Sequence, residues 1–124
     1  MVGEVRSYRD LIVWQQAMDL AVATYELTRL WPKDELYGLT SQSRRASVSV
    51  CANIAEGYGR DTRPGYIQFL RIAQGSLKEL ETHLIIAQRI ELSAAGKIDD
   101  LLSQCESVGK LLKSLIRKLE GEGT

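Results

Sequence analysis

Apolar residues recur every three or four positions through four segments of this 124-residue chain, and only short breaks separate the segments. This spacing places apolar side chains along one face of an α-helix. The segments cover about residues 10–31, 40–58, 64–91 and 94–119. Four amphipathic helices joined by short loops predict an all-α, antiparallel up-down-up-down four-helix bundle. The length fits one compact domain, so we expect residues 1–124 to form a single domain.

Each of the last two segments has one main apolar stripe. In the third segment the stripe consists of Tyr66, Phe69, Leu70, Ala73, Leu77, Leu80, Leu84 and Ala87. In the fourth it consists of Ile98, Leu101, Leu102, Cys105, Val108, Leu112, Leu115 and Leu119. We expect both stripes to face the core of the bundle.

The first segment carries two apolar stripes. We expect the stripe with the closer spacing to face the core: Leu11, Trp14, Met18, Ala21, Val22 and Tyr25. The other is rotated by about 100° and contains Val13, Leu20 and Leu27. The third segment likewise has apolar residues off its main stripe, namely Ile67, Ile85, Ile86 and Ile90. Large exposed apolar patches are unusual on monomers, so this surplus favours a homo-oligomer.

Capping and turn residues predict where the helices begin and end. N-cap residues are expected at three helix starts: Asp10, then Thr62 or Asp61, and finally Ser93. Pro64 then falls in the first turn of the third helix, where its missing N–H costs little. Gly57 and Gly59 are expected to end the second helix.

Residue types that carry enzyme chemistry are scarce. Cys51 and Cys105 belong to no CxxC pair, which argues against zinc, and we expect both to pack as buried, reduced thiols. A di-iron bundle needs two Glu-x-x-His motifs, but Leu80 stands three residues before the single histidine, His83. Neither a phosphate-binding P-loop nor a GxSxG motif is present. We predict no enzyme, cofactor, metal or small-molecule substrate; an enzyme with an unrecognised site is the remaining alternative.

Charge and hydropathy restrict the partners. The first ten residues lack the apolar run of a signal peptide, and no stretch approaches the ~20 apolar residues of a membrane span, so we expect a cytoplasmic protein without membrane contact. Sixteen basic and sixteen acidic residues give zero net charge. Nucleic-acid-binding proteins usually have a basic excess, so contact here needs local clusters. The candidates are Arg44, Arg45, Arg60, Arg63, Arg117 and Lys118.

Three runs resemble one bacterial family: LIVWQQAMDLAVATYELTRLWP, YGLTSQSRRASVSVCANIAEGYGR and YIQFLRIAQGSLKELETHL. The most specific parts are residues 53–57, Asn-Ile-Ala-Glu-Gly, and residues 75–81, Gly-Ser-Leu-Lys-Glu-Leu-Glu. Over about residues 8–120 the chain resembles the four-helix-bundle proteins found in intervening sequences of 23S ribosomal RNA genes. That family includes the accessory variability protein of diversity-generating retroelements. The resemblance implies a homo-oligomer, a ring-shaped pentamer, and contact with nucleic acid.

Four polar residues in these matching runs stand in apolar surroundings. We expect Asn53, Glu56, Ser76 and Glu79 to form a polar network between the second and third helices. The sequence as a whole predicts a non-enzymatic, homo-oligomeric scaffold or accessory protein that touches RNA or DNA through the six basic residues. The alternative is a protein–protein interaction module without nucleic-acid contact.

Overall fold

The computed structural model describes residues 4–121, and helices make up most of that range. The four long helices are α1 (Ile12–Thr28), α2 (Ser41–Tyr58), α3 (Arg63–Arg89) and α4 (Ala95–Gly121). The described range contains no strand. The prediction of an all-α four-helix protein is therefore confirmed.

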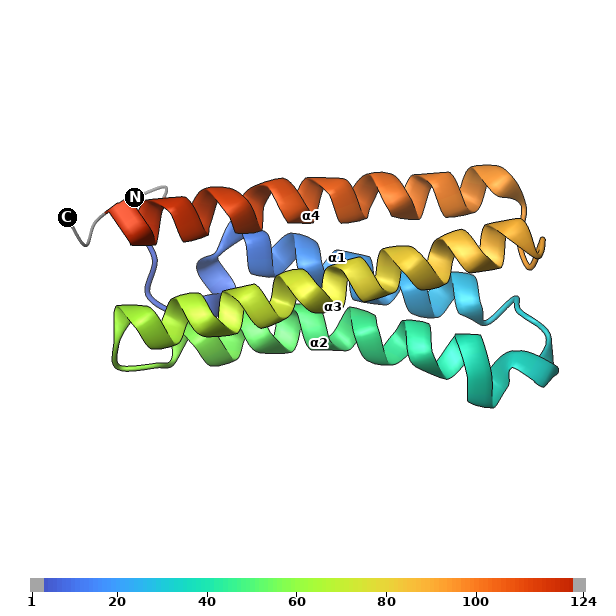
Figure 1. Ribbon diagram of the computed structural model, residues 1–124, viewed down its shortest axis with the longest axis horizontal. Helices are drawn as coiled ribbons and strands as arrows, with labels where there is room; N and C mark the ends of the chain where they lie inside the picture. The colour runs from blue at the N-terminus through green and yellow to red at the C-terminus, as the bar shows by residue number, and fades with distance from the viewer. Residues whose placement is uncertain (1–3, 122–124) are drawn as a thin grey trace.

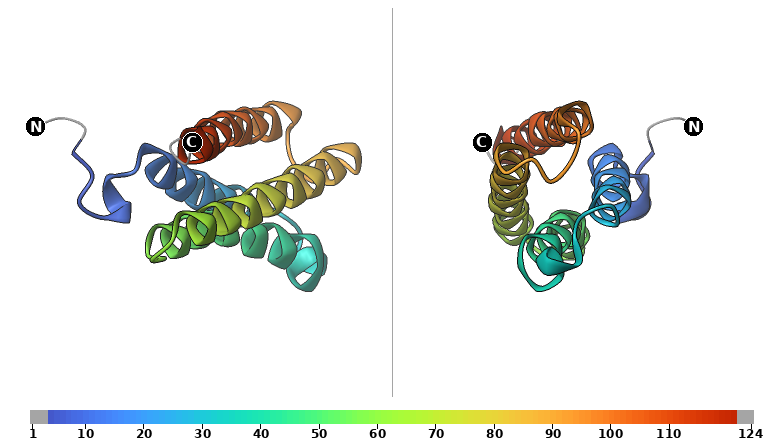
Figure 2. Two further views of the ribbon diagram at one scale, coloured as in Figure 1. Left: turned by 60° about the vertical axis from the view of Figure 1, so that its left-hand side comes forward. Right: turned by 90° about the vertical axis from the view of Figure 1, so that its right-hand side faces the viewer.

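Each helix in Figure 1 runs back along the one before it, so the first described residues and the end of α4 lie at the same end of the bundle. The end-on view in Figure 2 shows the helices arranged around a common centre. Each helix packs against the helices before and after it, α1 also packs against α4, and the α2–α3 pair has the most extensive contact.

The core contains the stripes that the sequence predicts for α3 and α4. On α3, the predicted residues from Leu70 to Ala87 are buried, while Tyr66 and Phe69 are half-buried at the start of the helix. On α4, Leu102, Leu115 and Leu119 are half-buried at the edge of the core. Ile116, which the pattern did not include, is buried.

The predicted core face of α1 is wrong for Met18, Val22 and Tyr25, whereas Ala21 is buried and Leu11 and Trp14 are half-buried against the core. The buried side chains of this helix are Val13, Ala17, Leu20, Ala21, Thr24, Leu27 and Thr28, so the core contains the stripe predicted to be spare. Met18, Val22 and Tyr25 are exposed instead. The buried threonines fit an apolar core because their hydroxyls bond to their own helix: Thr24 donates to the Leu20 carbonyl and Thr28 to the Thr24 carbonyl, both at 2.8 Å.

Two predicted N-caps have other roles. The Asp10 carboxylate accepts hydrogen bonds from the Arg6 and Ser7 amides, at 2.9 and 3.2 Å, and so closes a separate 3-10 turn, Tyr8–Asp10, before α1 begins. The Ser93 hydroxyl accepts the indole N–H of Trp31 at 2.5 Å. This contact joins the α3–α4 connection to the end of α1 rather than capping α4.

Both ends of α3 have clear capping geometry. Thr62 is the N-cap, as predicted, because its hydroxyl accepts from the Gly65 amide at 3.1 Å, and Pro64 lies in the first turn. At the other end, the Leu92 amide donates to the Ala87 carbonyl at 2.9 Å, while Glu91 has a left-handed φ of 59°. This is the Schellman ending, with glutamate where glycine is usual.

Gly57 does not end α2, which continues through it to Tyr58. It is a packing residue. A Cβ at this position would lie 2.9 Å from the Phe69 Cβ and 3.1 Å from the Tyr66 carbonyl oxygen, both on α3. Only glycine allows the two helices to approach so closely here.

Replacing Gly57 with alanine should therefore lower the free energy of unfolding by about 1–3 kcal/mol, the range typical of overpacking. Urea unfolding followed by circular dichroism measures the change. The matched control is Gly75→Ala on α3, where an added Cβ meets nothing within 4 Å. It should stabilise the subunit by about 0.5–1 kcal/mol through helix propensity alone. Equal effects of the two substitutions would contradict this role of Gly57.

Candidate functional site

An apolar stripe on α1 is exposed next to α2. It consists of Met18, Val22 and Tyr25, and the residue Val22 is 53% exposed. The Arg44 guanidinium of α2 lies 4.8 Å from the centroid of the Tyr25 ring, which places the stripe beside α2. Such contacts between a cation and an aromatic face are attractive.

The neighbouring part of α2 extends this apolar surface. Residues 46–55 contain no charged side chain, and Val48 is 43% exposed in the middle of them. We call Met18, Val22, Tyr25 and Val48 the α1–α2 face. Removing apolar surface from water yields about 25 cal/mol per Å², so this face favours contact with another apolar surface.

A second exposed stripe lies on α3. It consists of Ile72, Ile86 and Ile90, each of which is at least 43% exposed. Their spacing is close to whole helical turns, so they share one side of the helix. Ser76 follows Ile72 by one turn, and its hydroxyl lies 2.7 Å from the Ser49 hydroxyl of α2. The α3 stripe therefore lies on the side of α2 that faces α3, whereas the α1–α2 face lies on the side of α2 that faces α1.

Two of the four residues of the predicted polar network are brought together through a third, unpredicted one. Asn53 donates its side-chain N–H groups to the carbonyl and hydroxyl oxygens of Ser49, at 2.8 and 3.0 Å. Ser49 in turn contacts Ser76 across the helix interface. Ser49 thus connects Asn53 on α2 with Ser76 on α3, and the Ser49–Ser76 bond, which crosses the interface, fixes the register of the two helices.

The two glutamates of the predicted network do not take part in these bonds. Glu56 lies at the surface, 3.7 Å from the Arg60 guanidinium one turn later. Glu79 is exposed and has no hydrogen bond or ion pair within residues 4–121. Carboxylates remain in water unless paired, whereas serine and asparagine tolerate partial burial once hydrogen-bonded.

The six basic candidates do not form one patch. Arg44 and Arg45 lie in the first half of α2, and Arg60 follows its end, about 22 Å further along at 1.5 Å per residue. Arg44 is half-buried, and its Nε–H donates to the Thr28 hydroxyl at 2.8 Å. Arg45 is exposed on the surface of α2.

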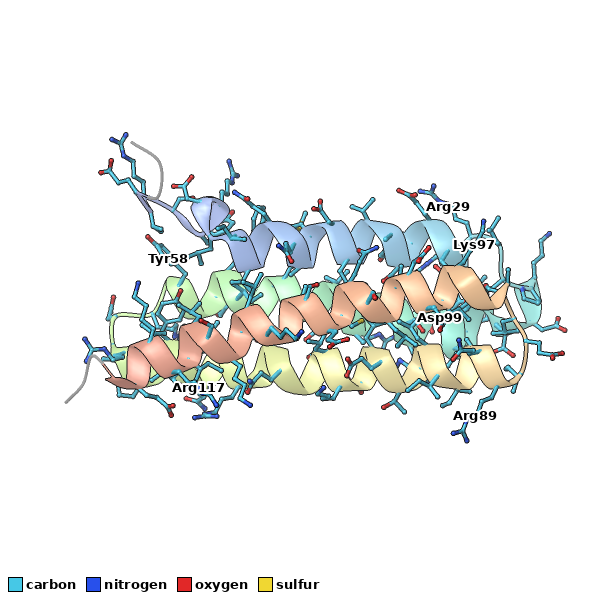
Figure 3. The ribbon with its side chains drawn as sticks, turned by 90° about the horizontal axis from the view of Figure 1, so that it is seen from above. Arg29, Tyr58, Arg89, Lys97, Asp99 and Arg117 are labelled. Atoms are coloured by element: carbon cyan, nitrogen blue, oxygen red, sulfur yellow. The ribbon has the colours of Figure 1, made fainter. Side chains whose placement is uncertain are left out.

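The other four candidates lie at the opposite end of the bundle, where α4 ends. Arg60 pairs with Glu56 and stacks 4.8 Å from the centroid of the Phe69 ring. Arg63 begins α3 at the same end. Figure 3 shows Arg117 at this end, far from Arg29 and Lys97 at the other. Arg117 and Lys118 are exposed and make no ion pair with any residue that the structure describes.

The nearby acidic residue of α4 is already paired. Glu120 accepts a hydrogen bond from the Arg71 guanidinium of α3 at 2.6 Å. This ion pair ties the end of α4 to α3. It leaves Arg117, Lys118 and the exposed Lys113 as three cations on the last turns of α4, without an ion-pair partner among the described residues. We call these three the α4 basic end.

The side chains that most often bind metals are dispersed. Within residues 4–121, no three histidine, cysteine, aspartate or glutamate residues gather closely enough to hold a metal ion. No helix in that part of the chain has an apolar stretch long enough to cross a membrane. Cys51 and Cys105 are free and buried, as predicted. Burial, with a smaller effect of the Glu81 charge, raises the pKa of Cys105 to about 12.

Over residues 9–114 the sequence matches the family of 23S rRNA-intervening sequence proteins. The chain belongs to this family. The fold is also similar to that of a protein of unknown function from the S23 ribosomal protein family of Bacteroides thetaiotaomicron VPI-5482, seen in a crystal structure. The two share 25% identity with a TM-score of 0.79, over 85% of this chain and 98% of the other. No curated protein matches the chain significantly.

The raised pKa of Cys105 predicts a loss of stability at high pH. In the unfolded chain the thiol ionises near its ordinary pKa of 9.0, whereas the folded thiol stays protonated to about 12. The contribution of this group is therefore fully present below pH 9 and is lost as the pH rises toward 12. Chemical denaturation at successive pH values should show this decline. Cys105→Ala should make the decline shallower, whatever its effect at neutral pH, and an unchanged slope would contradict the assignment.

Proposed function

We propose that the protein is a homo-oligomeric scaffold whose subunits associate through the α1–α2 face and the α3 stripe. The observation that carries the proposal is that two separate apolar surfaces, on either side of α2, stay exposed after the core has formed. Zero net charge also favours self-association, because like copies do not repel one another strongly.

Two different surfaces on one subunit suit a ring. When one patch contacts a different patch on the next copy, the contact is heterologous, and a rotation that closes gives cyclic symmetry. The resemblance to the retroelement accessory proteins supports five copies. In the proposed ring, Met18 and Val22 of each subunit pack against Ile72 and Ile86 of its neighbour. We place this assembly in the cytoplasm.

Light scattering at micromolar concentration tests the assembly. The expected mass is five times the 13.9 kDa of the subunit. Val22→Glu and Ile86→Glu should each reduce it to that of a single subunit, because a ring needs both surfaces and a buried unpaired charge is costly. Ser103→Glu on the exposed side of α4 is the control and should leave the mass unchanged. A wild-type mass of one subunit would overturn the proposal.

A second proposed activity is contact with RNA or DNA through the α4 basic end. Its support is that the last turns of α4 expose three cations, Lys113, Arg117 and Lys118, while Glu120 is paired with Arg71. The membership of the similar crystal structure in a ribosomal protein family agrees with an RNA partner. A ring would repeat each small basic cluster around its axis and so strengthen the attraction for phosphates. A pure protein–protein module is the alternative.

Salt-dependent binding distinguishes these two functions. Affinity for a mixed RNA or DNA oligomer should fall steeply with salt, with a slope of about 0.7 per neutralised phosphate on single strands. Arg117→Gln combined with Lys118→Gln should weaken binding and reduce that slope. Arg89→Gln combined with Lys97→Gln removes the same charge from the opposite end and should leave binding intact. Absence of binding at low salt would favour the pure protein–protein module.

A further inference from the structure

A crevice of about 230 Å³ lies where the end of α1 and the chain after it meet the start of α2. It is lined by Thr28, Arg29, Trp31, Pro32, Lys33, Leu36, Thr40 and Arg44. At about 30 Å³ per water molecule, it has room for a tetrahedral oxyanion. This crevice is at the opposite end of the bundle from the α4 basic end, and neither proposed function uses it.

The charge around the crevice is positive. Arg29, Lys33 and Arg44 line it, and no acidic residue is among the described residues that do so. Glu35, two residues after Lys33, does not line the crevice, and its carboxylate accepts from the Leu39 amide at 3.3 Å. The crevice also adjoins the point where the helical turn Leu36–Thr40 runs into α2.

Two contacts hold the Arg44 side chain in place. Its Nε–H donates to the Thr28 hydroxyl at 2.8 Å, and its guanidinium stacks on the Tyr25 ring. Four further N–H donors are carried by its terminal nitrogens, which make no hydrogen bond with the residues that the structure describes. A fixed guanidinium with free terminal donors is suited to bidentate contact with a phosphate.

Thr40 gives the observation that points to a ligand. Only 3% of this residue is exposed, and its hydroxyl oxygen is buried without a hydrogen-bond partner in the described structure. The side chain does not cap α2, because the helical turn Leu36–Thr40 continues directly into that helix. An unpaired buried hydroxyl is unfavourable by about 1–3 kcal/mol. A threonine hydroxyl in a helix has two accessible rotamers, so it can turn toward an acceptor in the crevice.

We propose that this crevice binds a single phosphoryl group, held by Arg29, Lys33, the terminal nitrogens of Arg44 and the hydroxyl of Thr40. The first three residues supply positive charge, and Thr40 gains the acceptor that it lacks. The phosphoryl group belongs either to free phosphate or to the phosphorylated end of a nucleotide chain.

Calorimetric titration with inorganic phosphate, at an ionic strength matched with chloride, tests the site. Wild-type protein should bind, and Arg29→Gln combined with Lys33→Gln should weaken binding about tenfold or more, as loss of a charge-assisted hydrogen bond does. The control, Arg89→Gln combined with Lys97→Gln, removes the same charge outside the crevice and should retain wild-type affinity. Equal affinity of all three proteins would overturn the proposal.

The substitution Thr40→Val distinguishes an effect on phosphate binding from an effect on the stability of the fold. Valine keeps the shape of threonine and removes the orphaned hydroxyl, so without phosphate the variant should be at least as stable as wild type. Phosphate should then raise the melting temperature of the variant less than that of wild type. An equal rise would show that the hydroxyl does not contact the anion and would overturn its role.

A 5′-phosphorylated dinucleotide and its unphosphorylated twin identify the source of the phosphoryl group. Tighter binding of the phosphorylated dinucleotide than of inorganic phosphate assigns the site to nucleotide ends, and the reverse order assigns it to the free ion. The site is overturned if neither phosphate probe binds, or if the twin binds as tightly as the phosphorylated form. These outcomes do not depend on the α4 basic end, since its variants retain the crevice.

Discussion

The close contact between α2 and α3 determines where everything else in this bundle lies. Gly57 lets the helices approach until a single added carbon would meet the Phe69 Cβ at 2.9 Å. The Ser49–Ser76 hydrogen bond then fixes the register along the same interface, while Asn53, one turn after Ser49 on α2, also bonds to the Ser49 hydroxyl. A one-turn slip would separate the Ser49 and Ser76 hydroxyls in partly buried positions, which is unfavourable. The positions of the exposed apolar stripes and of the basic residues depend on this register.

Periodicity predicted the number of helices, their approximate bounds and the core faces of α3 and α4, because each of those helices has one dominant stripe. It failed on α1, where two stripes compete. The buried stripe contains Ala17, Thr24 and Thr28, and residues of this kind add little to an apolar pattern. The threonines can be buried because their hydroxyls bond to their own helix, which an apolar count does not register.

The sequence predicted which types of residue the candidate site contains better than it predicted how those residues are arranged. Asn53 and Ser76 could be singled out as polar residues in apolar runs, but Ser49 could not, since its role depends on a residue of another helix. A charge pair one turn apart, such as Glu56 with Arg60, is readable from spacing. The Arg71–Glu120 pair joins distant parts of the chain, so only the packed bundle reveals that Glu120 is paired with α3 rather than with the cations of α4.

In the proposed ring, the two apolar surfaces on either side of α2 would make each subunit a wedge. In a closed circle of wedges, the angle between the contact faces sets how many copies complete the turn. Because α2 lies between the faces and is locked to α3 at Gly57 and Ser49, the geometry that holds one subunit together would also set the stoichiometry of the assembly. A substitution deep in the α2–α3 interface, far from any partner, would then change the size of the circle and leave the contacts themselves intact.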